Sequence, residues 1–506
     1  MDSFTSSVNS QVIYLDGYDT TCSTLSIPFC YWYKNDSPSS ANEFMPAKVL
    51  EEAFYKALLE FPILAGYIRT NSYSRMYVDV NKDNLNMPVY TDTTACCNLT
   101  YSAMSDSGFD LRKLPINLHG KYGVPAPVGL LNRQIKPAFF HVLRFKDNGG
   151  VFIYASVAHC LVDGYGFVSF MNRWAEIAKW MQQPEDVKEK QPLPTRKYTH
   201  DRLAFANMRS DETNALDSKL ASCSSGRDLY SKWLASRPTN ARGRILKGYL
   251  EPRKYVLSTF HIPSKTLEDL RDSVQKHAPA GVKYSINDII TAYISIVCTK
   301  AEKKELDDEF KKPLSRVLQK INVFARQSKD QRKLDLEIAV NIRPRIKDSR
   351  PDAKDYMGNM AFGKGIELST GVVDVEPTDE ALSVLALKVH ELAKSADEQY
   401  FSQLKGFLER KPDNYLRKLF SASRSNYALI VSNHTRFPHY NVDFGAGIPA
   451  LVHKGPHGSN GFVYVMPAHP SVGGYVIETK FSPAATTNII QNSNWMKLVD
   501  KFDSFS

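Results

Sequence analysis

Apolar residues recur at helix or strand spacing along most of the chain, and these patterns predict a mixed α/β protein. Residues 47–61 carry an apolar stripe with the three- and four-residue spacing of a half-buried helix, and residues 167–180 repeat this spacing. Between them, two apolar runs at 138–145 and 151–157 flank Asp147-Asn148-Gly149-Gly150, a sequence that suits a tight turn. We therefore expect a β-hairpin followed by a sharp bend and a helix.

Residues 184–242 interrupt this pattern and predict a boundary between two domains. The segment is rich in charged residues, Ser and Pro, and has no sustained apolar periodicity. We therefore predict an N-terminal domain at residues 1–183, a crossover at 184–242 and a C-terminal domain at 243–506. In the C-terminal domain, residues 285–299 have helical spacing, and the charge-dense residues 302–335 predict a solvated helical face and loop. Four further apolar runs predict strands, at residues 337–342, 427–431, 462–466 and 475–479.

The composition is that of a globular protein with a mild positive charge. Of 506 residues, 43% are hydrophobic and 23% charged, which excludes a disordered or fibrous protein. The 64 Lys and Arg residues exceed the 54 Asp and Glu residues by 10, which favours an anionic partner without naming one. Seven cysteines without a CxxC pair argue against a disulfide scaffold or a zinc cluster and for a reducing compartment. We predict no metal site.

Targeting and membrane signals are missing from the sequence. The N-terminus has neither the basic nor the apolar region of a signal peptide, and no run of 18 apolar residues could span a bilayer. No basic-aromatic module for nucleic acid is present. We therefore expect a cytoplasmic monomer that neither crosses a membrane nor binds nucleic acid.

One short motif has the residues for chemistry, whereas the motifs of several large enzyme classes are absent. The chain has no GxxxxGK[ST], GxGxxG, HExxH or GxSxG. It has HxxxD twice, at His159/Asp163 and His439/Asp443, where about one chance match is expected. The first copy follows a buried strand and is followed by Gly164, so its histidine is placed to meet a substrate. The second lies in a loop flanked by Pro and Tyr.

Both residues of the first copy also have a purely structural explanation. His159 could be a core histidine with satisfied hydrogen bonds, and Asp163 could be a first-turn carboxylate that interacts with the helix dipole. The local motif leaves these roles open beside catalysis, so the distribution of other motifs has to decide.

Five separated motifs occur in a characteristic order. They are Phe61–Gly66, the HxxxD bend, Ser285–Asp288, Asn341–Arg345 with Tyr356–Asn359, and Val431–Arg436 leading into Asp443–Pro449. In this order, and over residues 45–480, they resemble the BAHD family of CoA-dependent acyltransferases. The resemblance implies two chloramphenicol-acetyltransferase-like α/β domains, each a mixed β-sheet flanked by helices, with a channel at their interface. CoA would enter this channel from one face and the acceptor from the other.

The resemblance also implies roles for individual residues around the HxxxD bend. His159 matches the general base of the family, and Asp163 matches the aspartate that holds the local geometry. Arg343 matches the arginine expected to form an ion pair with Asp163 and so to lock the bend, which includes Gly164.

Other matches are structural or concern the cosubstrate. Residues 443–447 match the DFGWG loop of the family, which lies remote from the chemistry, although Ala446 replaces its tryptophan. Arg271 and Ser285 stand where relatives place residues near CoA, and Ser285 is also a plausible helix N-cap. The altered loop and the extra length in the crossover and near 300–335 suggest a divergent member, for which a fungal origin is one option. The structural residues of the loop are Asp443, Gly445 and Gly447.

The implied reaction is transfer of an acyl group from acyl-CoA to a small-molecule alcohol or amine, in secondary metabolism. A neutral histidine can accept the acceptor's proton, which typically accelerates a reaction by ~10²–10⁴. Attack within a ternary complex needs no covalent intermediate, so Cys160 beside His159 is not required. Two alternatives remain open: an enzyme like a condensation domain that uses carrier-protein thioesters, although Ala158 replaces the first histidine of HHxxxDG, and a non-catalytic binding member of the fold.

Overall fold

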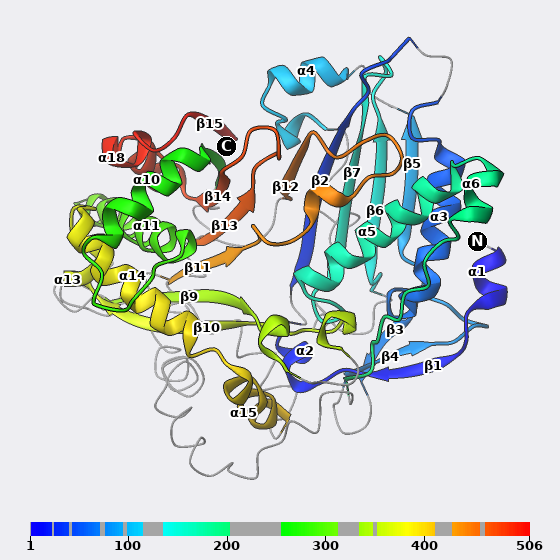
Figure 1. The fold of residues 1–506 in the computed structure, drawn as a ribbon, viewed down its shortest axis with the longest axis horizontal. Helices are drawn as coiled ribbons and strands as arrows, with labels where there is room; N and C mark the ends of the chain where they lie inside the picture. Colours follow the sequence, from blue (N-terminus) through cyan, green and yellow to red (C-terminus); the bar gives the residue numbers. More distant parts are fainter. Residues whose placement is uncertain are drawn as a thin grey trace.

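Two α/β halves lie side by side in the molecule, each built on one large β-sheet (Figure 1). This architecture confirms the predicted α/β class. The computed structural model describes residues 2–22, 25–39, 43–70, 76–94, 99–114, 135–202, 255–311, 333–347, 352–409, 428–455 and 461–505.

The N-terminal half contains a five-stranded sheet in the order β12-β2-β7-β6-β5. β6 and β7 form the predicted hairpin, in which Ala138 pairs with Val157 and Arg144 pairs with Val151. Asn148 in the turn has a φ of +51°, a conformation that asparagine tolerates better than most residues. The strands are β2 (Ser26–Lys34), β5 (Val89–Thr94), β6 (Ala138–Arg144), β7 (Gly150–Ala158) and β12 (Leu451–Lys454).

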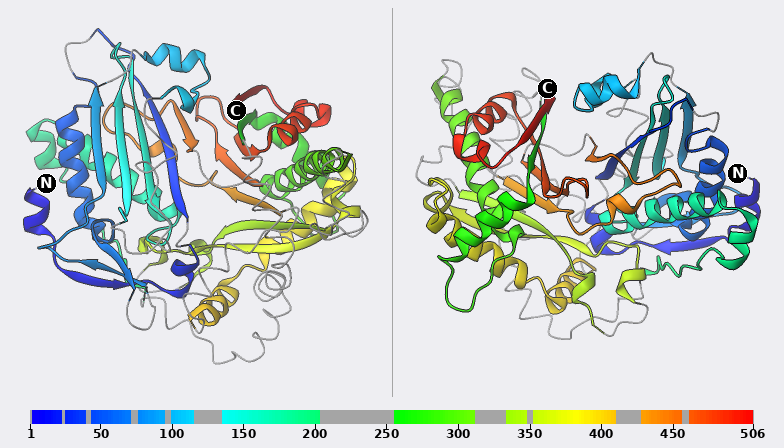
Figure 2. Two further views of the ribbon diagram at one scale, coloured as in Figure 1. Left: turned by 180° about the vertical axis from the view of Figure 1, so that it is seen from behind. Right: turned by 45° about the horizontal axis from the view of Figure 1, so that its top comes forward.

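Two long helices cover one face of this sheet, α3 (Ala47–Glu60) and α5 (Gly164–Met181), as Figure 2 shows from behind. The indole N–H of Trp174 in α5 donates to the backbone carbonyl of Leu50 in α3 at 2.8 Å, and its ring packs edge-on against Phe54. Both helices were predicted, but α5 begins three residues earlier than its apolar stripe. Its first turn contains two glycines, which leave no hydrophobic signal in the sequence.

The C-terminal half contains a seven-stranded sheet in the order β10-β9-β11-β13-β14-β8-β15. All four strands predicted here exist, and the predicted helix at 285–299 continues to residue 311. The strands are β8 (Val256–Ile262), β9 (Lys333–Asn341), β10 (Ala361–Ser369), β11 (Ala428–Asn433), β13 (Phe462–Pro467), β14 (Tyr475–Phe481) and β15 (Lys501–Phe505). Among the described residues, the helices of this half are α10 (Ser264–Gln275), α11 (Ile286–Lys311), α13 (Thr370–Val373), α14 (Asp379–Lys394), α15 (Glu398–Glu409), α17 (Pro483–Ile490) and α18 (Ser493–Met496).

A small antiparallel sheet, β1-β4-β3, completes the N-terminal half. Its strands are β1 (Gln11–Tyr14), β3 (Tyr67–Thr70) and β4 (Met76–Val80). The remaining α-helices are α1 (Asp2–Ser7), α2 (Gly17–Thr21), α4 (Tyr101–Asp106) and α6 (Glu185–Lys190). The 3-10 helices are η1 (Pro62–Ala65), η2 (Leu111–Lys113), η5 (Arg343–Arg345), η6 (Ala353–Asp355) and η7 (His439–Asn441).

The chain of the C-terminal half crosses back to the N-terminal sheet. After β11 it runs over α5 and adds β12 as an edge strand, antiparallel to β2, before returning as β13 (Figure 1). The two halves therefore share a sheet as well as an interface. Of the predicted crossover, α6 and the residues up to 202 are described, and residues 203–242 lie outside the described part. The boundaries at 183 and 242 remain predictions.

Four cysteines in the described part, Cys22, Cys30, Cys160 and Cys298, are buried and free. Cys96, Cys97 and Cys223 lie outside it. Within the described residues, none of the helices combines the length and the hydrophobicity that a bilayer span requires.

Candidate active site

Strand β7 carries His159 to the junction between the two halves. The strand ends at Ala158, and a five-residue turn leads from there into α5. The backbone N–H of His159 donates to the carbonyl of Leu25 at 3.0 Å, which ties the turn to the chain just before β2. The residues that follow it, Cys160 to Asp163, are buried, whereas His159 itself keeps partial exposure. Of the five residues in this turn, His159 is the one that is not fully buried.

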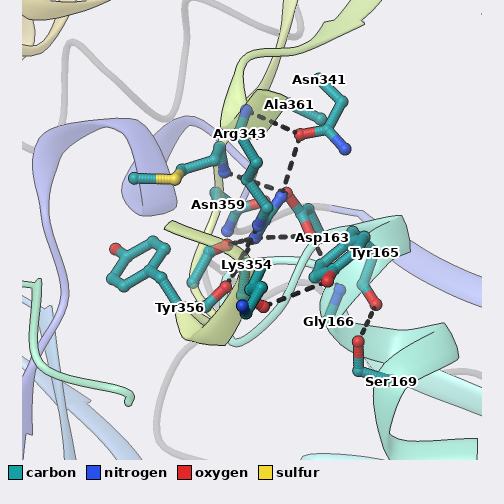
Figure 3. A network of polar contacts seen from close by, with 12 residues as sticks. Asp163, Tyr165, Gly166, Ser169, Asn341, Arg343, Lys354, Tyr356, Asn359 and Ala361 are labelled. Atoms are coloured by element: carbon teal, nitrogen blue, oxygen red, sulfur yellow. Dashed lines mark hydrogen bonds and ion pairs between the residues drawn. The ribbon is translucent and has the colours of Figure 1, made fainter. Parts of the chain in front are cut away.

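Asp163 caps helix α5 and forms the predicted ion pair with Arg343 (Figure 3). Its Oδ1 accepts from the backbone N–H of Gly166 at 3.0 Å, which is the N-cap interaction of α5. The two carboxylate oxygens also accept from Nη1 and Nη2 of Arg343, at 2.6 Å and 3.2 Å. A further donor is the backbone N–H of Met360 at 2.9 Å. The structural explanation for Asp163 and the predicted pairing therefore hold together.

Arg343 is as buried as its partner and has an acceptor for each of its guanidinium nitrogens. The side chain of Asp163 is 0% exposed and that of Arg343 3%. Nε of Arg343 donates to the carbonyl of Tyr356 at 3.1 Å, and Nη2 donates to the carbonyl of Gly358 at 2.6 Å. The guanidinium also lies over the ring of Tyr165, 4.5 Å from its centre. Because a buried charge is tolerated only when it is paired and hydrogen-bonded, this network fixes the bend to η5 and the segment after it.

Asn359 holds the carbonyl side of the same bend. Its amide donates to the carbonyl of His159 at 2.8 Å and to Oδ1 of Asp19 at 2.7 Å. Arg202 reinforces this arrangement, because it donates to the carbonyl of Leu161 and to Oδ2 of Asp19, each at 2.7 Å. The sequence motif contained Asn359 without indicating this contact. Nothing in the sequence marked Asp19 or Arg202, since their mutual contact joins residues 183 positions apart.

The environment of His159 favours the neutral imidazole. Burial lowers its pKa below the ordinary value of 6.5, and the charge of Lys454 acts in the same direction, while Asp163 opposes it. A neutral imidazole at pH 7 has a free lone pair, which is the form that can accept a proton. The neighbouring Cys160 is a poor nucleophile by the same measure, because burial raises the pKa of its thiol to about 12.

His434 lies against this bend and His439 packs on His434; the sequence motifs contained both histidines without placing either beside the bend. A Cβ at Gly164 would lie 3.0 Å from Cε2 of Phe437 and 3.4 Å from Cε1 of His434, so the absence of a side chain lets these rings approach the start of α5. His434 and His439 lie parallel to each other, with ring centres 5.9 Å apart. His439 belongs to the second HxxxD copy, for which the sequence predicted a loop flanked by Pro and Tyr, and the residue begins the 3-10 helix η7.

The loop at residues 443–447 lies at the other end of α5 from His159. Oδ1 of Asp443 accepts from the backbone N–H groups of Gly445 at 2.8 Å and Gly447 at 2.9 Å, and Lys179 donates to Oδ2 at 2.6 Å. Both glycines have φ near +95°, a conformation that side chains disfavour. Burial opposes ionisation of Asp443, but these donors lower its pKa overall. The loop fastens the chain between β11 and β12 to α5 and has no described contact with His159.

The two residues predicted near CoA lie on the C-terminal half, apart from the bend. Arg271 is on the surface of α10, where its guanidinium pairs with Asp272 at 2.8 Å. Ser285 caps α11: its Oγ accepts from the backbone N–H of Asp288 at 3.1 Å, and Asp288 accepts from the backbone N–H of Ser285 at 2.9 Å. This reciprocal pair confirms the predicted cap. A contact of either residue with CoA stays a prediction.

The described residues also enclose a cavity of about 510 Å³ elsewhere, between β1, the end of α3 and residues 196–202. His159 is not among its lining residues. Two of its charged side chains, Glu60 and Arg202, are already paired with Arg173 and Asp19. We assign this cavity no part in the chemistry.

Comparisons with known proteins agree with the order of the sequence motifs. A family model described as "Transferase family" matches residues 5–224 and 232–495. A hydroxycinnamoyltransferase from Narcissus pseudonarcissus is 22% identical over 481 residues, which cover 92% of this chain and 91% of that protein. Among solved structures, F. sporotrichioides TRI101 complexed with coenzyme A and T-2 has a TM-score of 0.68 at 15% identity, and covers 97% of this chain and 100% of its own. Vinorine synthase has a TM-score of 0.56 at 16% identity, with 97% of this chain and 98% of its own covered.

Proposed function

The chain belongs to the BAHD-type transferase family, and from this premise we propose that it transfers an acyl group from acyl-CoA to a hydroxyl or amine of a small molecule. His159 is the general base in this proposal, and Asp163 and Arg343 are its positioning residues. One observation carries the assignment: His159, whose pKa burial lowers, stands at the end of a core strand, on a bend held by a buried ion pair.

In the proposed reaction the acceptor attacks the thioester carbonyl while both substrates are bound. His159 takes the proton of the attacking hydroxyl or amine as the new bond to the acyl carbon forms. The tetrahedral intermediate then expels the CoA sulfur, and the imidazolium returns the proton to the leaving thiolate. The protons and bonds balance without a covalent enzyme intermediate, in keeping with the raised pKa of the Cys160 thiol.

The choice of acyl-CoA as donor is supported by the relatives and by charge. The similar fold of TRI101 was solved with coenzyme A bound, and the curated relatives include hydroxycinnamoyltransferases. An excess of ten positive charges over the whole chain suits a cosubstrate that carries several phosphates. The acyl group, the acceptor, the monomeric state and a cytoplasmic location remain predictions.

Acceptor-dependent release of CoA tests the proposal. Purified protein is incubated with a panel of acyl-CoAs and a pool of alcohols and amines, while free thiol and product mass are followed. We expect thiol release that depends on the acceptor and that His159→Ala reduces by at least ~10²-fold, the lower range of general-base catalysis.

A matched control is His277→Ala, because His277 is exposed at the end of α10 and pairs only loosely with Glu380, at 3.7 Å. It should retain wild-type activity. Equal thiol release by wild type and His159→Ala contradicts the mechanism, and activity with carrier-protein thioesters alone favours the condensation-domain alternative.

A further inference from the structure

A buried lysine belongs to a group of side chains, with Phe29 and His434, that packs against the bend carrying the proposed base. Lys454 is the last residue of β12, the edge strand that the C-terminal half adds to the N-terminal sheet, and it pairs in register with Phe29 of β2. It is 4% exposed. We name Lys454 together with His159, His434 and His439 the imidazole–lysine cluster. Burial lowers the pKa of all three histidines, and the positive charge of Lys454 acts in the same direction.

Aromatic faces surround the ammonium group of Lys454. Its Nζ lies 3.9 Å from the centre of the Phe29 ring and 5.2 Å from that of Tyr464. The Phe29 ring in turn lies 4.7 Å from His439 and 5.6 Å from His434, measured between ring centres. Aromatic rings attract a cation but accept none of its N–H groups as well as an oxygen does.

The acidic group that acts on Lys454 is bonded to its backbone rather than to its ammonium. The buried Glu478 of β14 is the one acid that acts on the pKa of Lys454, and both of its carboxylate oxygens accept from the backbone N–H of Lys454, at 3.0 Å and 3.1 Å. Its Oε1 is also 3.5 Å from Nδ1 of His453. Among the described residues, no hydrogen bond or ion pair to Nζ of Lys454 occurs.

The other titratable groups facing the cluster are held uncharged by burial or are already paired. Burial lowers the pKa of His439 to about 3 and that of His434 well below its ordinary value, and burial raises the pKa of Tyr31, whose hydroxyl lies 3.3 Å from Nδ1 of His439. The carboxylate of Asp163 is already paired with the guanidinium of Arg343. Burial disfavours the charged form of Lys454 and lowers its pKa to about 7, although the negative charge of Glu478 acts to raise this pKa.

We propose that the Lys454 ammonium binds an anionic oxygen of the reacting complex, beside the base His159. The inference rests on the proposed acyl transfer, because it places the anion next to the group that performs the chemistry. Three N–H donors in a water-poor, aromatic site would interact strongly with such an oxygen. The anionic oxygen has two possible sources: the oxyanion that forms on the thioester carbonyl during attack, or a carboxylate carried by the acceptor.

Steady-state kinetics of Lys454→Met separate the two sources. The variant keeps the apolar stem but removes the charge, and it is assayed with two acceptors that differ only by a carboxylate or its methyl ester. Loss of an oxyanion donor should lower kcat by ~10²–10³ with both acceptors, at nearly unchanged KM. Loss of a carboxylate partner should raise KM by about tenfold or more for the acid alone. Lys454→Arg should restore part of the activity in either case.

Lys480→Met is the matched control, because Lys480, although only half-buried, also lies over an aromatic ring, that of Tyr255 at 5.5 Å, and burial also lowers its pKa. Circular dichroism and the melting temperature show whether each variant folds. If folded Lys454→Met has the kcat and KM of Lys480→Met with both acceptors, the proposal is overturned. His159→Ala in the same assay keeps the outcomes distinct: an active His159→Ala overturns the proposed function, whereas an inactive one beside a fully active Lys454→Met overturns only the role of Lys454.

Discussion

Arg343 and Lys454 are both buried cations near His159, yet their surroundings are opposite. Arg343 directs its guanidinium at two carboxylate oxygens and two backbone carbonyls, whereas the ammonium of Lys454 faces two aromatic rings. A cation whose donors are all used can hold structure but has nothing left for a ligand. A cation whose donors are unused costs stability in the free protein and keeps its capacity for a substrate or transition state. The difference suggests that the first organises the site and the second acts in it.

The largest expected effect is a loss of stability on removing Arg343, the cation whose N–H donors are all paired. Arg343→Met leaves the carboxylate of Asp163 buried without a counterion, and such a loss typically destabilises a protein by about 3–5 kcal/mol. Chemical denaturation of the variant measures this loss. Arg69→Met is the control, because Arg69 and Asp79 form an ion pair with side chains 43% and 30% exposed. Such exposed pairs contribute about 0–1 kcal/mol. An Arg343 variant as stable as the Arg69 variant would contradict the structural role of the pair.

A smaller effect, seen in the rate rather than in folding, is expected from Asp163→Asn. An asparagine oxygen can still cap α5 through Gly166, but the charge that attracts Arg343 is gone. The bend should then hold His159 less accurately, and a small misplacement of a catalytic group can cost ~10²-fold in rate. The ratio of kcat to that of wild type, measured under saturating substrates, checks this. Unchanged kcat in a folded Asp163→Asn protein would mean that the bend holds its shape without the ion pair.

This pair also marks how far sequence reasoning reached. The hairpin, the helices α3 and α5 and the strands of the second half follow from local periodicity, because each buries one side of a regular element. The Asp163–Arg343 contact joins residues 180 positions apart and came from the order of family motifs rather than from periodicity. The environment of Lys454 was beyond both approaches. Its strand β12 has only four residues and joins a sheet formed mostly by the N-terminal half, so no local pattern marks it.

The same limit applies to His439. The sequence predicted a loop here, whereas the residue begins the 3-10 helix η7, and the position of η7 depends on how the chain crosses from β11 to β12. Gly164, predicted only as part of the bend, allows this crossing by leaving room for Phe437 and His434. Long-range packing of this kind decides which loop residues reach a site, and the sequence of either segment alone does not contain it.

The pH dependence of kcat/KM should show, with a smaller effect, whether Lys454 acts in the reaction. If catalysis needs neutral His159 and charged Lys454, kcat/KM rises with pH through the lowered pKa of His159, below 6.5, and falls as Lys454 loses its proton above about 7. Lys454→Met should abolish the alkaline fall. It should also move the acid limb to higher pH, because the charge of Lys454 lowers the pKa of His159. An identical profile for wild type and Lys454→Met would contradict this coupling.

The smallest effect on stability is expected from removing Lys179, a paired but exposed cation at the end of α5 farthest from His159. Lys179 is 52% exposed and pairs with Asp443, whose Oδ1 still accepts from two backbone N–H groups when the lysine is removed. Lys179→Met should therefore cost about 0.2–1 kcal/mol of stability, as exposed ion pairs do, with unchanged kcat and KM. Urea denaturation and the thiol-release assay measure the two quantities. The loop at 443–447 fastens the chain that continues to Lys454. A fall in kcat without a fall in stability would therefore show that this loop acts on the reaction. The end of α5 near residue 443 would then not be purely structural.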